Sequence, residues 1–83
     1  GMSTLDLNKE IIELYPNPGK GQFYFSSPLE KKMSYTIYDT IGSIVESNTL
    51  VKNESSLNLT HLNKGVYIIT FINGLSQRII IIK

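Results

Sequence analysis

The chain has 83 residues, the length of a single domain. It contains no cysteine, which excludes disulfide bonds and thiolate metal sites, so aliphatic and aromatic packing must supply the whole core. Eight basic and seven acidic side chains give a net charge of +1, and the longest basic run, Lys31-Lys32, is too short to follow a phosphate backbone, so nucleic acid is not an expected partner.

The first residues are polar and carry no targeting signal. Gly1 precedes Met2, an order that translation does not produce, so Gly1 is interpreted as an expression-tag scar. Residues 3–13 include four charged side chains and lack the hydrophobic region of a signal peptide or a transmembrane span. We therefore expect residues 1–10 to be a tag scar and a flexible segment, with no membrane insertion. Any export signal is expected elsewhere on a longer chain.

Beyond residue 10, short apolar runs alternate with turn signals, which indicates β structure. The first predicted strand covers residues 11–15. It ends at Pro16-Asn17-Pro18-Gly19-Lys20-Gly21, because two prolines and two glycines in six residues exclude helix and central strand. The Gly-Lys-Gly part lacks the spacing of a phosphate-binding loop and is predicted to be a surface turn.

The next two predicted strands alternate apolar and polar positions. Residues 22–26 place Phe23 and Phe25 on one face and Tyr24 on the other. In residues 33–39, every second side chain is predicted to face the core, and Asp39 and Gly42 then form a turn. The alternating set that we expect inside is Met33, Tyr35 and Ile37, against Ser34, Thr36 and Tyr38 outside.

Four further strands are predicted over residues 43–51, 56–59, 65–71 and 76–83. Leu57 and Leu59 share one face of the second of these runs. Asn73-Gly74 lies between the last two runs and is a strong hairpin signal. The final run contains four consecutive isoleucines, Ile79 to Ile82, which indicates burial on both faces or an outer face covered by a partner.

The segment Leu62-Asn63-Lys64-Gly65-Val66-Tyr67 has the form L-x-x-G-x-Y at the entry to the sixth strand. In immunoglobulin-like sandwiches, a tyrosine at this place turns its hydroxyl back to the backbone a few residues upstream. Seven short strands with a tyrosine corner predict an all-β fold. The expected architecture is an immunoglobulin-like antiparallel β-sandwich with Greek-key connections over residues 11–83.

No catalytic constellation can be assembled from these residues. The single histidine, His61, is predicted to be an exposed turn residue rather than a metal ligand. Glu10 and Glu13 are three residues apart and do not form a pair for glycoside hydrolysis. We therefore expect no enzymatic activity, no cofactor and no metal.

Two non-catalytic functions fit a small sandwich of this kind. A sugar-binding or adhesive module of a secreted protein needs an exposed aromatic platform, for which Tyr24 and Tyr38 are the candidates, although the chain has no tryptophan. A passive spacer in a multidomain chain is the other alternative.

Several motifs together resemble a known family. Leu14-Tyr15-Pro16-Asn17-Pro18 opens the domain, Tyr35-Thr36-Ile37-Tyr38-Asp39 lies in its middle, and Leu62 to Ile68 is followed by a β-rich strand ending in lysine. Their order and spacing resemble the C-terminal sorting domain of type IX (Por) secretion cargo from Bacteroidetes. The resemblance covers residues 11–83.

This resemblance implies a tag that directs a cargo protein across the outer membrane. The implied route passes through the periplasm to the cell surface or the extracellular space. The implied partners are the outer-membrane secretion machinery and a sortase-like peptidase that removes the domain. The residues that the resemblance assigns to recognition are Pro16, Asn17, Pro18, Lys64, Gly65, Val66, Tyr67, Arg78 and Lys83.

Physical features of two of these segments favour recognition. The Pro-x-Pro segment is expected to be stiff and extended, with few donors of its own, as suits a groove. The final strand is expected to offer a free edge for strand addition, and a weak edge-strand dimer is a further expectation.

Overall fold

The computed structural model describes residues 13–83, which fold into seven strands without a helix. The expected flexible segment 1–10, and Ile11 and Ile12 of the first predicted strand, lie outside the described residues. The strands are β1 (Leu14–Tyr15), β2 (Gln22–Phe25), β3 (Met33–Tyr38), β4 (Ile44–Leu50), β5 (Ser56–Asn58), β6 (Gly65–Phe71) and β7 (Ser76–Ile81).

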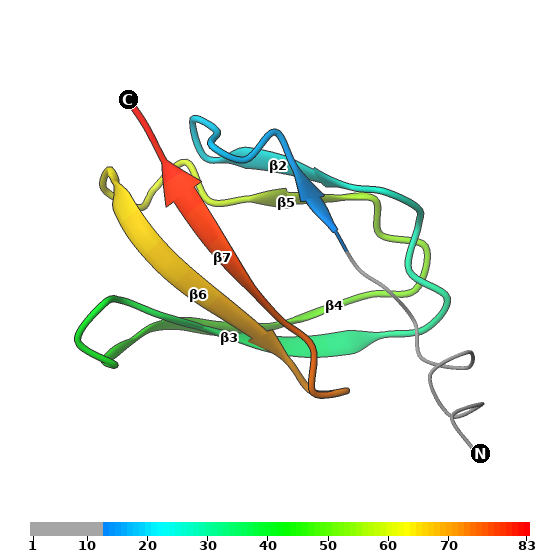
Figure 1. Ribbon diagram of the computed structural model, residues 1–83. Helices are drawn as coiled ribbons and strands as arrows, with labels where there is room; N and C mark the ends of the chain where they lie inside the picture. Colours follow the sequence, from blue (N-terminus) through cyan, green and yellow to red (C-terminus); the bar gives the residue numbers. More distant parts are fainter. Residues whose placement is uncertain (1–12) are drawn as a thin grey trace, which may run out of the picture.

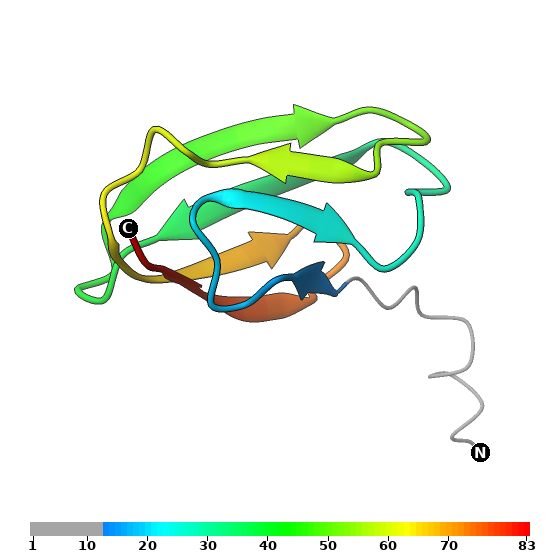
Figure 2. The ribbon, with the colours of Figure 1, turned by 90° about the horizontal axis from the view of Figure 1, so that it is seen from above.

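The strands form two antiparallel sheets, with the orders β1-β2-β5 and β4-β3-β6-β7. Figures 1 and 2 show the two sheets as the layers of a sandwich. The pairs β2–β5 and β3–β6 are not consecutive in sequence, so the chain crosses between the sheets after β2, β4 and β5. The predicted seven-strand sandwich is therefore confirmed.

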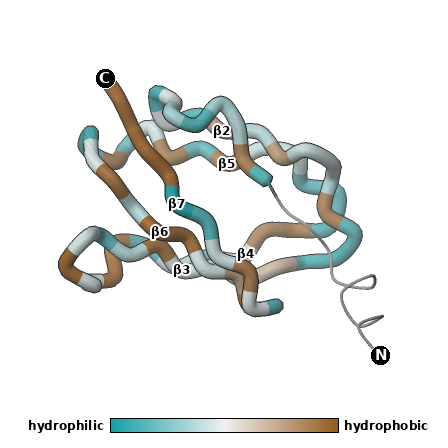
Figure 3. Tube along the Cα trace, in the orientation of Figure 1, coloured by the Kyte–Doolittle hydropathy of each residue, from teal (hydrophilic) through white to brown (hydrophobic). Residues whose placement is uncertain are grey.

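The core lies between the two sheets and is made by alternate side chains of the strands. Phe23 and Phe25 are buried while Tyr24 between them is exposed, as the sequence predicts. Leu57 and Leu59 are also both buried. Figure 3 shows hydrophobic and hydrophilic residues along the same strands. The buried residues are Leu14, Phe23, Phe25, Leu29, Met33, Tyr35, Ile37, Leu50, Leu57, Leu59, Ile69, Phe71, Ile79 and Ile81.

The isoleucine run at the end of the chain is buried on one face only. Ile79 and Ile81 are in the core, whereas Ile80 is half-buried and Ile82 is 50% exposed. The prediction of burial on both faces is therefore wrong, because β7 belongs to the outer layer of a two-layer sandwich and its second face has no layer over it. A β-branched run predicts a strand, but not how many of its faces are covered.

β6 coincides with its prediction, and every strand ends within two residues of its predicted end. Both predicted turns are present. Asp39 accepts hydrogen bonds at Oδ1 from the backbone of Ile41 (3.1 Å) and Ser43 (2.9 Å). In the last hairpin, Gly74 has φ 95° and its N–H donates to the Phe71 carbonyl at 2.9 Å, so a type I turn is followed by a left-handed glycine.

Candidate functional site

The predicted tyrosine corner is present at the start of β6. The Tyr67 hydroxyl donates to the carbonyl oxygen of Asn63 at 2.8 Å, four residues upstream. The Tyr67 ring is half-buried and packs against the core. Gly65 has φ 155°, in the region that favours glycine, and lets the chain enter β6 from the loop. This corner fixes the loop of residues 60–64 to the sheet.

The outer edge of β7 is covered by the loop that follows β1. The side chain of Asn17 donates from Nδ2 to the Arg78 carbonyl (2.6 Å) and accepts at Oδ1 from the Ile80 N–H (3.0 Å). Gly19 continues the contact through its backbone, donating to the Ile80 carbonyl (2.9 Å) and accepting from the Ile82 N–H (2.8 Å). In Figure 2 this loop runs beside β7.

The same edge is closed further along by Gln77. Its side chain accepts at Oε1 from the Leu14 N–H (3.2 Å) and donates from Nε2 to the Leu14 carbonyl (3.3 Å). The expectation that β7 offers a free edge for strand addition is therefore wrong. The Arg78 carbonyl, both backbone groups of Ile80 and the Ile82 N–H are already bonded to Asn17 or Gly19, so a partner strand cannot use them.

The Pro-x-Pro segment is also different from the expected extended ligand. Pro16, Asn17 and Pro18 are exposed on their outer sides, and the peptide bonds before both prolines are cis. The segment lacks proline N–H groups, but Asn17 supplies a donor and an acceptor that bind it to β7. It is thus part of the folded surface rather than a free, stiff peptide.

Gly19 explains how the loop can approach β7 so closely. A Cβ at this position would lie 2.5 Å from the Pro16 carbonyl oxygen and 2.9 Å from the Phe23 ring. The predicted surface turn is confirmed for Lys20, which is exposed, whereas Gly19 and Gly21 on either side are buried. These glycines serve close backbone packing rather than anion binding.

Lys83 connects β7 to the loop that precedes β6. Its ammonium group donates to the carbonyl oxygens of Thr60 at 2.7 Å and Leu62 at 2.6 Å. Together with the Tyr67 bond to Asn63, three carbonyls of this loop accept hydrogen bonds from β6 or the C-terminal residue. The ammonium group of Lys83 therefore already has two hydrogen-bond partners within the domain.

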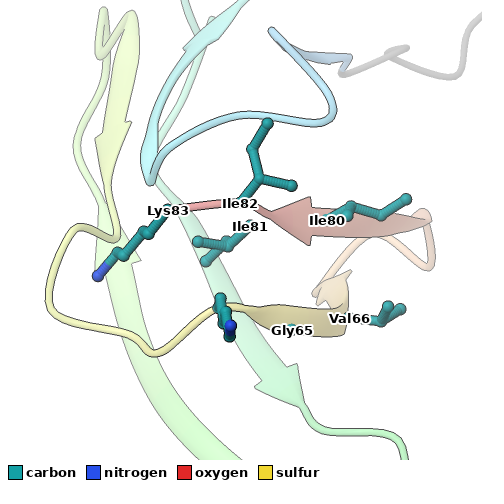
Figure 4. Close-up of a pocket in the computed structure, with 7 residues that line it drawn as sticks. Gly65, Val66, Ile80, Ile81, Ile82 and Lys83 are labelled. Atoms are coloured by element: carbon teal, nitrogen blue, oxygen red, sulfur yellow. The ribbon is translucent and has the colours of Figure 1, made fainter.

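A shallow apolar groove lies where β6 begins and β7 ends (Figure 4). Its volume is about 450 Å³, and Val66 and Ile82 on it are both exposed. Lysine side chains stand at its polar end. The lining residues are Lys64, Gly65, Val66, Ile80, Ile81, Ile82 and Lys83.

The fold thus gathers most of the residues that sequence resemblance singled out. Lys64, Gly65, Val66 and Lys83 line the groove. Asn17 is bonded to the edge of β7 at Ile80, beside the groove. Pro16 and Pro18 flank Asn17 in sequence and therefore lie near the same edge. Tyr67 lies next to the groove lining in sequence and holds the adjoining loop.

Arg78 lies outside the groove. It is paired with Ile68 in the β6–β7 ladder and is not one of the lining residues. Its backbone carbonyl, however, accepts the hydrogen bond from Asn17. Sequence reasoning missed Gly19 and the acceptor carbonyls of the 60–64 loop as parts of this surface. The glycine pair around Lys20 is a signal for close packing, but nothing local in the sequence reveals its partner strand.

His61 is exposed in its turn, as predicted, and it also contacts a carboxylate on another strand. Its Nε2 is hydrogen-bonded to Oε1 of Glu46 on β4, and the other carboxylate oxygen accepts a bond from the Tyr35 hydroxyl at 2.7 Å. Burial, followed by this hydrogen bond and the charge of Glu46, raises the pKa of Tyr35 well above its usual range. Glu46 thereby links the core to the 60–64 loop.

Within residues 13–83, no three histidine, aspartate or glutamate side chains come together as a metal site. No helix in this range is long and apolar enough to cross a membrane.

Comparison with known proteins identifies the family. Residues 13–83 match the family described as the secretion system C-terminal sorting domain, known as the Por secretion tail. The chain is also 34% identical, over 80 residues, to β-agarase A of Zobellia galactanivorans. That alignment covers 94% of this chain but only 15% of the agarase, so the chain spans a small part of that relative's length. The chain belongs to the family of C-terminal sorting domains that direct cargo proteins to secretion by the type IX (Por) system.

Proposed function

We propose that the secretion machinery recognises one composite surface of the folded domain, which we call the sorting surface. It consists of Pro16–Gly19, Lys64–Val66 and Ile80–Lys83. The observation that supports it is the pair of bonds from Asn17 to β7, which brings the first loop of the domain against its last strand. Such a surface exists only after folding, so its recognition reports that the whole domain has folded.

The chemistry of the sorting surface suits a protein partner. Val66 and Ile82 expose apolar area beside the lysines, and a groove with an apolar floor and a basic end fits a partner segment that has apolar and acidic side chains. Ile80 and Ile82, whose outer face the sequence predicts to be covered by a partner, line this groove. Because the edge of β7 is occupied, the partner binds through side chains rather than by adding a strand to β7.

We further propose that residues 11–83 are the sorting unit and have no catalytic role of their own. The family's interaction with the type IX machinery implies delivery to the cell surface or the extracellular space. Transit through the periplasm and removal by a sortase-like peptidase complete the proposed route. An edge-strand dimer stays a prediction, and β4, an end strand without lysine, arginine or proline, is the strand through which it would form.

The test is export of a reporter fused in front of the full chain in a type IX-competent bacterium. Lys64→Glu and Ile82→Ser alter the sorting surface at exposed side chains and are expected to reduce the exported share of reporter severalfold. Lys52→Glu and Ile72→Ser, at exposed positions elsewhere, are the matched controls and should leave export unchanged. Equal export by all four folded variants would reject the proposed surface.

A further inference from the structure

A second surface lies on the opposite layer, on the outer face of the three-stranded sheet. Tyr15 on β1 is paired directly with Tyr24 on β2, and Tyr24 is paired on its other side with Ser56 on β5. Gln22 and Asn58 form the neighbouring pair. Directly paired residues share a face of a sheet, and so do residues two apart in a strand, so these five side chains lie on one face.

The two tyrosines leave a continuous aromatic surface open to solvent. Tyr15 is 52% exposed and Tyr24 is 46% exposed, and their ring centroids are 6.3 Å apart with the planes tilted by 39°. A single exposed aromatic ring needs no explanation, but two adjacent rings on a flat sheet form a larger patch. Their cross-strand contact also stabilises the sheet, although it does not require either ring to remain half uncovered.

Polar groups suitable for hydroxyl recognition border the rings. Asn58 accepts at Oδ1 from the Thr60 N–H (3.0 Å) and the Thr60 hydroxyl (2.7 Å), which fixes the side-chain amide and leaves its NH₂ group as a donor. The side chains of Gln22 and Ser56 take part in no hydrogen bond within residues 13–83. They add donors and acceptors on the same face.

The charge of this face argues for an uncharged ligand. All five side chains are neutral, and the flanking charged residues are Glu13, Lys20 and Glu54, two residues before Tyr15, Gln22 and Ser56 respectively. This mixture has no surplus of positive charge, which a sulfated or phosphorylated polymer would need. Pyranose rings present electropositive C–H groups to the electron-rich face of an aromatic ring, and their hydroxyls bind amides and hydroxyls.

We propose that the Tyr15–Tyr24 face binds a neutral polysaccharide, with the rings stacking against sugar faces and Gln22, Ser56 and Asn58 binding hydroxyls. None of these five side chains belongs to the sorting surface, and they lie on the other sheet from the groove, so this function is separate from sorting. It gives the exported domain affinity for neutral glycans. Of the two tyrosines expected as a sugar platform, Tyr24 is retained and is joined by Tyr15, while Tyr38 lies on β3 in the other sheet.

The experiment is calorimetric titration of the full chain with cellohexaose, laminarihexaose, mannohexaose and galactohexaose, with dextran sulfate as the anionic polymer. Binding to at least one neutral hexasaccharide is expected. Tyr15→Ala and Tyr24→Ala should each weaken it about tenfold, whereas Tyr24→Phe keeps the ring and most of the affinity. Tyr38→Ala is the matched control and should not change it.

Circular dichroism verifies the fold of each variant. If Tyr24→Ala fails to fold, Tyr15→Ala and Gln22→Ala decide, since Tyr15 and Gln22 are not in the buried core. The proposal is overturned if none of the four neutral hexasaccharides binds, if only dextran sulfate binds, or if the tyrosine variants bind as well as the Tyr38→Ala control. None of these outcomes bears on export, so the sorting function is tested separately.

Discussion

Single side chains hold the 60–64 loop in place, and each does so from a different element. Tyr67 binds the Asn63 carbonyl from β6, and Lys83 binds the Thr60 and Leu62 carbonyls from the C-terminus. His61 extends the other way, to Glu46 on β4. The loop leads directly into the groove-lining residues Lys64 to Val66, so these contacts set the position of one side of the sorting surface.

The corner hydroxyl has a measurable effect on stability. Tyr67→Phe removes the bond to Asn63 and is expected to lower the free energy of unfolding by about 1 kcal/mol. Tyr67→Ala also removes the packed ring and should cost roughly 3 kcal/mol or more. Urea unfolding of both variants measures this, with Tyr38→Phe as the control for a tyrosine outside the corner. A Tyr67→Phe variant as stable as the parent chain would contradict the role of the hydroxyl.

The raised pKa of Tyr35 predicts how stability depends on alkaline pH. Below the ordinary tyrosine pKa of 10.0, both the folded and the unfolded chain keep the phenol proton, so its contribution is fully present. Above pH 10.0 the unfolded chain releases the proton while burial and Glu46 retain it in the fold, so the folded state binds more protons and stability falls as pH rises.

Urea unfolding between pH 9 and pH 11 tests this for Tyr35→Phe against the parent chain. Phenylalanine has no proton to lose, so its stability should decline less steeply over that interval. The other tyrosines and the lysines contribute equally to both proteins and therefore cancel. Parallel curves for the two proteins would show that Tyr35 does not carry the effect.

At the scale of elements, the covered edge of β7 is the feature that organises the domain. β1 has only two residues, yet the loop after it continues along β7 through Asn17 and Gly19 and adds a parallel bridge between Gly19 and Ile81. An uncovered edge strand of isoleucines would be prone to pair with other chains. The loop protects that edge and at the same time builds the sorting surface from both ends of the domain.

Asn17→Ala tests this protection. It removes the side-chain partner of the Ile80 N–H and is expected to cost about 1 kcal/mol of stability and to speed hydrogen exchange of the Ile80 amide. Asn48→Ala is the control, because the Asn48 side chain accepts a hydrogen bond only from the neighbouring Thr49 N–H, on β4 at the opposite edge of the sheet. Unchanged exchange at Ile80 in the Asn17 variant would show that the loop does not close the edge.

At the scale of the whole molecule, periodicity predicts the fold well because alternation along a strand is local. Phe23, Phe25 and the core positions of β3 follow from it directly. The joining of Asn17 to Arg78 and Ile80 could not be predicted, since it links residues 61 and 63 positions apart by one side chain with no periodic signal. For the same reason the sequence predicts a stiff, extended segment at Pro16–Pro18 and a free edge on β7, whereas in the structure the two are bonded to each other.

Truncation of the C-terminal strand does not separate recognition from folding. Deleting residues 77–83 would remove most of β7 and the buried Ile79 and Ile81, so loss of export after that deletion reflects loss of the fold as well as loss of recognition. Substitutions at exposed positions such as Lys64 and Ile82 separate the two, because they leave the core unchanged.

The sorting function is measured most directly as the share of a reporter enzyme found outside the cell. For this measurement, all 83 residues are fused behind a signal peptide and the reporter in a type IX-competent bacterium. We expect the fused reporter to reach the cell surface or the medium, while the same reporter without the domain stays inside the outer membrane. Retention of a stably folded fusion inside the outer membrane, at the level of the reporter without the domain, would contradict it.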